Sequence, residues 1–164
     1  MKTRFLLAAG LIGLVLFSSC GRSDAPAGTA PAATADDLAQ GRAVFERVCA
    51  VCHQATGAGV PGVFPPLAGS EILAAADPAR PIRIVLHGLQ GPLTVRGGTY
   101  DSVMPAQGAQ LNDAEIAAAL SYARGAWGNR AGPVSAEAVR TVRATVKRDT
   151  FWTWDDLVRA TPAP

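Results

Sequence analysis

The chain has few side chains that bind metals tightly. Of its 164 residues, three are cysteines (Cys20, Cys49 and Cys52) and two are histidines (His53 and His87). A structural zinc site takes about four such ligands, usually from closely spaced pairs. A dithiol redox site requires a strand, a loop and a helix around its C-x-x-C motif, whereas the single C-x-x-C motif here falls late in a stretch of helical apolar periodicity. The composition therefore argues against both kinds of site.

Lysine is also scarce. Lys2 and Lys147 are the only lysines, and the sequence has no run of basic residues. Without Lys2 and Arg4, which precede the apolar run described next, the 15 basic residues fall to 13 and equal the 13 acidic ones. A formally neutral chain lacks the basic surface that binds phosphate backbones. Nucleic-acid binding is therefore not expected.

The sequence has an apolar run near its start that is too short to span a bilayer. It extends from Phe5 to Phe17 and has 13 residues, whereas a membrane-spanning helix takes about 20. Lys2 and Arg4 precede it, and this order is typical of a signal peptide. We therefore expect residues 1–19 to be a signal peptide that is removed on export.

The end of this segment resembles a bacterial lipobox, in which a cysteine becomes the lipidated first residue of the mature protein. The letters are L-F-S-S-C-G, with Cys20 as the cysteine. Phe17 stands where the pattern usually has leucine or another aliphatic residue. Lipidation of Cys20 would leave Cys49 and Cys52 as the remaining cysteines. Ordinary signal cleavage without a lipid is the alternative.

Composition divides the rest of the chain into three parts. Residues 20–35 have no aliphatic side chain larger than alanine and cannot bury a core. We expect them to be the lipidated N-terminus and a flexible linker, followed by a domain over residues 36–131. Residues 132–164 are predicted to be a helical extension, with Ser135 capping a helix that ends near Lys147. The apolar stripe of this helix is expected to pack on the domain, with a partner-docking surface as the alternative.

Two long helices are predicted to form the centre of the domain. The first covers Ala35–Val51, with Thr34 and Asp37 as a capping box. Gly41 lies on its apolar face, where the absence of a side chain permits the close approach of another element. The second helix runs from the N-cap Asn112 to Gly128.

Three shorter elements are predicted between these helices. One helix covers residues 71–76. Another has Asp77 as its N-cap and Pro78 at its first position, and it runs to His87. Two strands, residues 93–95 and 99–100, are expected to pair as a small hairpin.

Residues 49–53 form the motif C-A-V-C-H, the attachment pattern of c-type haem. Cysteines three positions apart lie on one face of a helix, where Cys49 and Cys52 can form thioethers to one porphyrin. The next residue, His53, then directs its imidazole at the iron. An iron-bound histidine usually donates its other ring N–H to an oxygen, and the backbone carbonyl of either Pro65 or Pro66 is the expected acceptor.

Five segments of the chain resemble a bacterial branch of the class I monohaem cytochromes c. They are C-A-V-C-H, F-P-P-L-A-G-S, I-V-L-H-G-L-Q-G-P, S-V-M-P and L-S-Y-A-R-G-A-W-G-N. The resemblance covers residues 36–131. It implies an all-α class I cytochrome c fold, in which N- and C-terminal core helices cross around one covalently bound haem c. Haem attachment in this class takes place outside the bacterial cytoplasm, which agrees with an exported chain.

The resemblance also implies the second iron ligand, because class I cytochromes c place a methionine on a non-helical loop before the last core helix. Met104 is the only methionine besides the initiator, and the following Pro105 disfavours helix at Met104. We therefore expect His53 and Met104 to bind the iron from opposite sides. The alternatives are that Met104 only fills the core, or that His87 is the ligand. His87 is expected to end a helix, where its imidazolium is favoured without iron.

Three further residues are candidate partners for the haem propionates: Arg96, Tyr100 and Trp127. Each could equally be a surface or packing residue. The domain has few large aliphatic side chains for its length, so the haem is expected to supply part of the core volume. The protein without haem is therefore expected to fold poorly.

The predicted function is electron transfer and not catalysis, because two protein ligands leave the iron no open site for a substrate. We expect a carrier that is lipid-anchored on the periplasmic side of a bacterial membrane, or soluble there if Cys20 is unmodified. The resemblance implies redox partners such as quinoprotein dehydrogenases, copper nitrite reductases or haem-copper oxidases. The alternatives are a haem enzyme subunit or gas sensor with a displaceable Met104, and a structural lipoprotein with a chance C-x-x-C-H motif.

Overall fold

The computed structural model describes residues 34–161. The predicted signal peptide (residues 1–19), the predicted lipidation site Cys20 and nearly all of the predicted linker lie outside the described residues. The regular structure of the described part is mostly helical, with one two-stranded hairpin. No helix in residues 34–161 is both long and apolar enough to cross a membrane.

One helical run leads from the start of the described chain to the histidine of the C-x-x-C-H motif. It consists of α1 (Ala35–Val44), the π-helical turn η1 (Phe45–Cys49) and α2 (Ala50–His53). The predicted capping box is confirmed, since the side chains of Thr34 and Asp37 each accept a bond from the other's backbone N–H. The run ends at His53, two residues beyond the predicted end, because Gln54 turns the chain with a φ of 61°.

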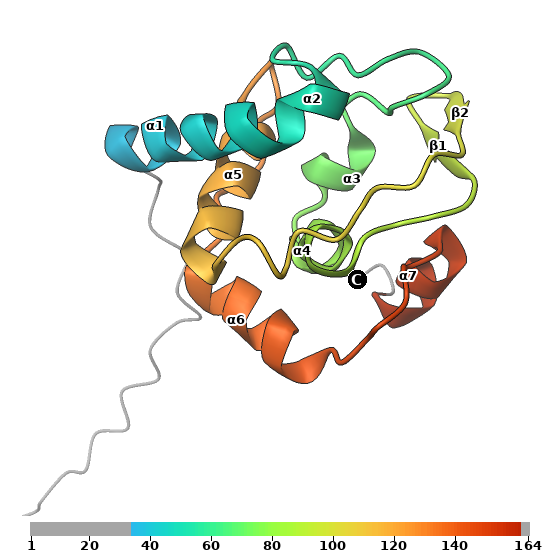
Figure 1. Cartoon of the computed structure of the whole chain (residues 1–164). Coiled ribbons are helices and arrows are strands. Elements are labelled where there is room, and N and C mark those ends of the chain that lie inside the picture. Colours follow the sequence, from blue (N-terminus) through green and yellow to red (C-terminus); the bar gives the residue numbers. More distant parts are fainter. Residues whose placement is uncertain (1–33, 162–164) are drawn as a thin grey trace, which may run out of the picture.

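Helix α5 (Asp113–Gly125) crosses this run (Figure 1). The predicted start is confirmed, with Asn112 and Glu115 forming a capping box. The crossing depends on Gly41, as predicted. A Cβ atom at that position would lie 2.2 Å from the carbonyl oxygen of Ala118 in α5, so a glycine is required where the two helices meet.

The predicted end of this second helix at Gly128 is wrong. Helix α5 stops at Gly125, and Trp127 adopts a φ of 53°. This turn returns the Trp127 ring onto the helix crossing, where its centroid lies 5.0 Å from that of Phe45 and 5.4 Å from that of Tyr122. Packing among three aromatic rings therefore decides where the helix ends.

The shorter helices fall close to their predicted positions. They are α3 (Glu71–Ala74) and α4 (Ala79–His87). The first ends two residues earlier than predicted. The prediction of Asp77 as the N-cap of α4 is wrong by one position, because Pro78 is the cap residue. Asp77 still serves this helix end, since its Oδ1 accepts the N–H of Ala79 at 2.9 Å.

The predicted hairpin is confirmed, although its second strand begins one residue earlier than predicted. Strands β1 (Leu93–Val95) and β2 (Gly98–Tyr100) pair antiparallel, with Leu93 opposite Tyr100. Arg96 and Gly97 form the two-residue turn, and both have positive φ, at 51° and 78°. Two left-handed residues give this turn the twist that a tight hairpin needs.

The C-terminal part of the described chain contains α6 (Ala136–Thr145) and α7 (Trp154–Ala160). Ser135 caps α6 by accepting the N–H of Ala138, but the helix ends at Thr145, two residues before the predicted Lys147. Helix α6 packs against α4 and α5. Helix α7, which the sequence did not predict, lies across the molecule from α1 in Figure 1.

Buried side chains form two clusters. The first joins α1, α4, α5 and α6, and it includes Val44, Ile82, Leu86, Ile116, Leu120, Val139 and Val142. The second joins α3, α4, β1 and the part of the chain after α6. It consists of Ile72, Ile84, Leu89, Leu93, Val95, Trp152 and Leu157. Members of both clusters line one cavity, so the space between them is where a bound group would complete the core.

Candidate haem site

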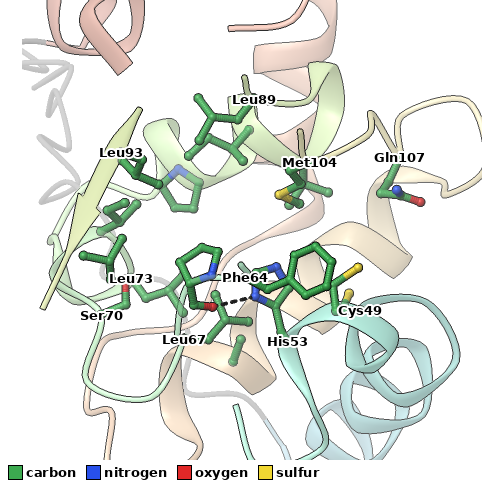
Figure 2. A pocket seen from close by; sticks show the side chains of 18 of the residues that line it. Cys49, His53, Phe64, Leu67, Ser70, Leu73, Leu89, Leu93, Met104 and Gln107 are labelled. Atoms are coloured by element: carbon green, nitrogen blue, oxygen red, sulfur yellow. Dashed lines mark hydrogen bonds between the residues drawn. The ribbon is translucent and has the colours of Figure 1, made fainter. Parts of the chain in front are cut away.

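A large cavity opens among the helices. Its empty space, including the open mouth, is about 1210 Å³. The wall is formed by aliphatic, aromatic and proline side chains with few polar groups, and Cys49, Cys52, His53 and Met104 all lie on it. The structure therefore brings together the four residues that the sequence singled out. Figure 2 shows His53 and Met104 reaching into this cavity from opposite sides.

His53 is held by a backbone carbonyl. It ends α2, it is 8% exposed, and its Nδ1–H donates to the carbonyl oxygen of Pro65 at 3.0 Å. The choice that the sequence left open is thus made in favour of Pro65. Burial lowers the pKa of His53, so the imidazole is neutral near pH 7, and its Nε2 is free to bind a metal.

The loop that carries Pro65 is set by a glycine. Gly59 has a φ of 64°, and a Cβ atom there would lie 2.3 Å from the carbonyl oxygen of Phe64 and 2.7 Å from that of Pro65. The N–H of Gly59 also donates to the carbonyl oxygen of His53 at 3.0 Å. The chain thus folds back closely on the histidine, which directs the Pro65 carbonyl at its ring.

Cys49 and Cys52 are free thiols at the cavity wall, and both are half-buried. Burial, together with the neighbouring Cys52, raises the pKa of the Cys49 thiol to about 11. This thiol is therefore neutral at physiological pH and is not poised as a metal-binding thiolate.

Met104 lies on the opposite side of the cavity from His53 (Figure 2). It belongs to no helix, in agreement with the effect expected of Pro105. Its backbone instead pairs antiparallel with Leu89. The side chain is half-buried and packs against the second cluster, which leaves its thioether available to the cavity.

His87 does not line the cavity. Its Nδ1–H donates to the carbonyl oxygen of Arg148 at 3.2 Å. The expectation that the helix end favours its imidazolium is wrong, because burial, with further contributions from the positive charges of Arg148, Arg143 and Lys147, lowers the pKa of His87. Burial is the main cause, and the bond to the Arg148 carbonyl, which favours the charged form, only partly offsets it.

The candidate propionate partners separate into two groups. Tyr100 lines the cavity, where it can contact a bound group. Trp127 and Arg96 are engaged elsewhere: the Trp127 Nε1–H donates to the carbonyl oxygen of Ala55 at 3.1 Å, and the Arg96 guanidinium donates to that of Ala68 at 3.3 Å. For these two the structure favours the packing alternative.

The sequence did not single out Asn129, which holds the loop beside Pro65. Its Nδ2 donates to the carbonyl oxygens of Leu67 and Ala123, at 3.0 Å and 2.7 Å, and its Oδ1 accepts the N–H of Gly69 at 2.8 Å. These partners lie in separate segments, so the role of Asn129 could not be predicted from its neighbours. Its only local signal is the W-G-N sequence after the helix.

The residues present fit a haem. The cavity is apolar, and a neutral histidine, two thiols and a thioether lie on its wall. Imidazole and thioether are the protein ligands of haem iron in cytochromes. Fold and site therefore define a helical haem-binding protein with a C-x-x-C-H attachment motif.

A family model, Cytochrome c, matches residues 38–127, and the chain belongs to this family. The family binds covalently attached haem c, and Cys49, Cys52 and His53 stand in the attachment motif. Cytochrome c-552 of Thermus thermophilus is 46% identical over 104 residues, which cover 58% of this chain and 79% of that protein.

Two other relatives are named as subunits of dehydrogenases. The cytochrome c subunit of quinone alcohol dehydrogenase from Gluconacetobacter polyoxogenes is 34% identical over 107 residues, covering 64% of this chain and 22% of that subunit. The cytochrome c subunit of gluconate 2-dehydrogenase from Pantoea cypripedii is 36% identical over 110 residues, covering 66% and 25% respectively. This chain thus spans about a quarter of the length of those two subunits.

Proposed function

We propose that the protein is an exported electron carrier with one haem c held between His53 and Met104. The observation that carries this proposal is the pairing across one apolar cavity. His53 is neutral, and the Pro65 carbonyl fixes its Nδ1. It faces Met104 across the cavity (Figure 2). Two side chains placed in this way would occupy both axial positions of an iron.

Each residue then has a defined task. Cys49 and Cys52 would tether the group covalently, and the Pro65 carbonyl holds the Nδ1–H of His53 so that Nε2 would be the ligating atom. The thioether of Met104 would be the second protein ligand, and the apolar wall would exclude water. The haem supplies a one-electron Fe(II)/Fe(III) couple, which thioether ligation shifts to higher potential. A closed pair of ligands leaves no place for a substrate at the iron.

A partner would dock at the mouth of the cavity. Three large aliphatic side chains support this: Val103 (53% exposed) lines the cavity, and Val51 (78%) and Val63 (42%) stand next to lining residues in the sequence. Val51 lies between the two haem cysteines, and Val103 precedes Met104. We propose that this uncharged rim makes brief, small contacts with a redox partner, as transient electron-transfer complexes do.

The partner class and the location complete the proposal. The relatives named as dehydrogenase subunits favour a dehydrogenase as electron donor, with a reductase or terminal oxidase as acceptor. The predicted signal peptide and the resemblance to a lipobox favour attachment through Cys20 on the periplasmic side of a bacterial membrane. A Cys20→Ala variant should then leave the membrane fraction and appear in the soluble periplasm, whereas its retention in the membrane would contradict a lipid anchor.

The oxidised optical spectrum tests the ligand pair. An iron–sulfur charge-transfer band is expected in the wild-type protein and should disappear in Met104→Ala. If the wild type lacks the band, Met104 is not the ligand.

Carbon monoxide distinguishes the alternative functions. The reduced native protein should not bind CO, because Met104 blocks the iron, whereas a gas sensor or haem enzyme with a displaceable methionine would bind it. A haem-stained denaturing gel should show covalent haem. An unstained band would contradict covalent haem attachment and favour the structural lipoprotein with a chance C-x-x-C-H motif.

A further inference from the structure

Met104 is held by backbone pairing and not by a helix. The N–H of Leu89 donates to the carbonyl oxygen of Met104 at 3.0 Å, and the N–H of Met104 donates to that of Leu89 at 2.8 Å. Both bonds join the methionine loop to the segment that follows α4. The position of the thioether therefore depends on where residues 88–90 lie.

The other edge of residues 88–90 is bound by the C-terminal segment. The N–H of Trp152 donates to the carbonyl oxygen of Gly88 at 3.1 Å, and the N–H of Gln90 donates to that of Trp152 at 2.8 Å. Leu89 thus forms an antiparallel bridge with Met104 and a parallel bridge with Trp152. Three segments that are far apart in the sequence lie side by side, with residues 88–90 in the middle.

Side-chain packing joins the same three segments. Trp152 is 6% exposed and belongs with Leu89 to the second cluster, against which Met104 packs. Gly88 lies between the outer two segments, since a Cβ atom there would be 2.5 Å from the Phe151 ring and 2.6 Å from the carbonyl oxygen of Met104. The methionine loop and the C-terminal segment are therefore in close contact through a single residue.

Trp152 is itself fixed by a charged side chain. The Arg148 guanidinium lies 4.1 Å from the centre of a Trp152 ring. It also donates to the carbonyl oxygen of Phe151 at 2.9 Å and to Oδ2 of Asp156 at 3.0 Å. One face of Trp152 is therefore covered by the Arg148 cation, and the bonds of this cation to Phe151 and Asp156 hold it there.

We propose that Trp152 is a positioning residue for the sulfur ligand, and that the C-terminal segment, residues 148–157, acts as a brace that keeps Met104 on the iron. This inference rests on the proposed His53/Met104 ligation. The brace lies beyond residues 38–127, the part that matches the cytochrome c family model. The C-terminal extension would thus oppose the loss of Met104 from the iron.

The test compares two variants of the full-length holoprotein. Trp152→Ala removes the brace contact. The matched control, Val139→Ala with Val142→Ala, truncates buried side chains of the first cluster, which contains neither Met104 nor Trp152. Thermal unfolding followed by circular dichroism ranks the global stability of both. All further measurements are made well below both unfolding temperatures.

Two readouts report on Met104. Hydrogen exchange of its amide, which bonds Leu89, should be about tenfold or more faster in Trp152→Ala than in wild type, because truncating a buried tryptophan costs far more than that factor requires. The iron–sulfur band should weaken and the reduced variant should bind CO. In the control both readouts should stay at the wild-type level. Trp152→Phe, which retains an aromatic ring, should lie between wild type and Trp152→Ala.

The contrary outcomes are distinct. If the wild type has the iron–sulfur band but Trp152→Ala leaves both the band and the exchange of Met104 unchanged, the brace is wrong and the ligation stands. Equal effects in the control at equal thermal stability would also overturn the brace, since general destabilisation would explain them. If the wild type lacks the band, the ligand assignment fails, and the positioning role of Trp152 falls with it.

Discussion

The two sides of the haem cavity are built in different ways. On the histidine side, His53 ends a helical run that crosses α5 at Gly41, and a carbonyl 3.0 Å away fixes its ring. On the methionine side, Met104 belongs to no helix, and its backbone is held by pairing with Leu89. The histidine is thus part of the helical core, whereas the methionine depends on contacts between separate loops. Local opening should therefore release the methionine first.

The largest effect is expected when the haem, which would join the two sides of the cavity, is not attached. A Cys49→Ser, Cys52→Ser variant without covalent haem should lose helical circular dichroism and a cooperative melting transition. The apolar walls then enclose an empty space that the chain cannot fill, a loss comparable with the whole stability of a small domain, about 5–15 kcal/mol. A spectrum and melting curve close to those of the holoprotein would show that the two sides stand without haem.

The histidine side can be disrupted at the helix crossing. In Gly41→Ala, the added methyl group meets the Ala118 carbonyl at 2.2 Å, and we expect a loss of about 3 kcal/mol, the upper end for overpacking. Chemical denaturation of the holoprotein measures it. The control is Gly125→Ala at the end of α5, where nothing lies within 4 Å. That change should be neutral or slightly stabilising, and an equal loss in both variants would rule out the close approach as the cause.

A smaller change separates the histidine ring from its carbonyl. Gly59→Ala and Gly62→Ala both place alanine at positive φ, 64° and 72°, but only the first meets Phe64 and Pro65. The shared backbone strain costs about 1–2 kcal/mol, and Gly59→Ala should lose more. Displacing the Pro65 carbonyl weakens the bond that makes His53 a stronger donor, so the reduction potential should rise in Gly59→Ala alone. Equal potentials in the two variants would contradict this role of Pro65.

The smallest expected effect concerns pH, and it falls on the methionine side. Burial and nearby positive charges lower the pKa of His87 in the folded protein. The unfolded chain therefore binds a proton at higher pH than the folded one, so stability is retained above about pH 6.5 and decreases as the pH falls below it. His53 does not contribute if it binds iron. Unfolding midpoints between about pH 7.5 and pH 5 should fall less steeply in His87→Gln, whereas parallel curves would exclude His87.

Much of the helical structure could be predicted because the responsible interactions are local. The caps at Thr34 and Asn112 depend on partners three residues away, and the hairpin turn depends on two adjacent residues. The errors arose where distant residues compete with local preference. Helix α5 ends before Gly128 because the Trp127 ring packs on Phe45, and no pattern in the segment itself announces that contact.

The site shows the same division. The motif at residues 49–53 predicted haem attachment because its chemistry lies within five consecutive residues. The choice of Pro65 over Pro66 required the path of the loop at Gly59. The surroundings of His87 could not be predicted, because the Arg148 carbonyl that it bonds comes from a segment far along the chain.

The sequence by itself determined the chemistry of this protein: two cysteines and a histidine in one motif, and a methionine before a proline. Only the tertiary structure decided how the methionine is held. Residues 88–90 join Met104 on one side to Trp152 on the other. Pairing of this kind depends on segments that meet only after folding, and hydrogen bonds between backbone atoms leave almost no trace in the identity of the residues that form them.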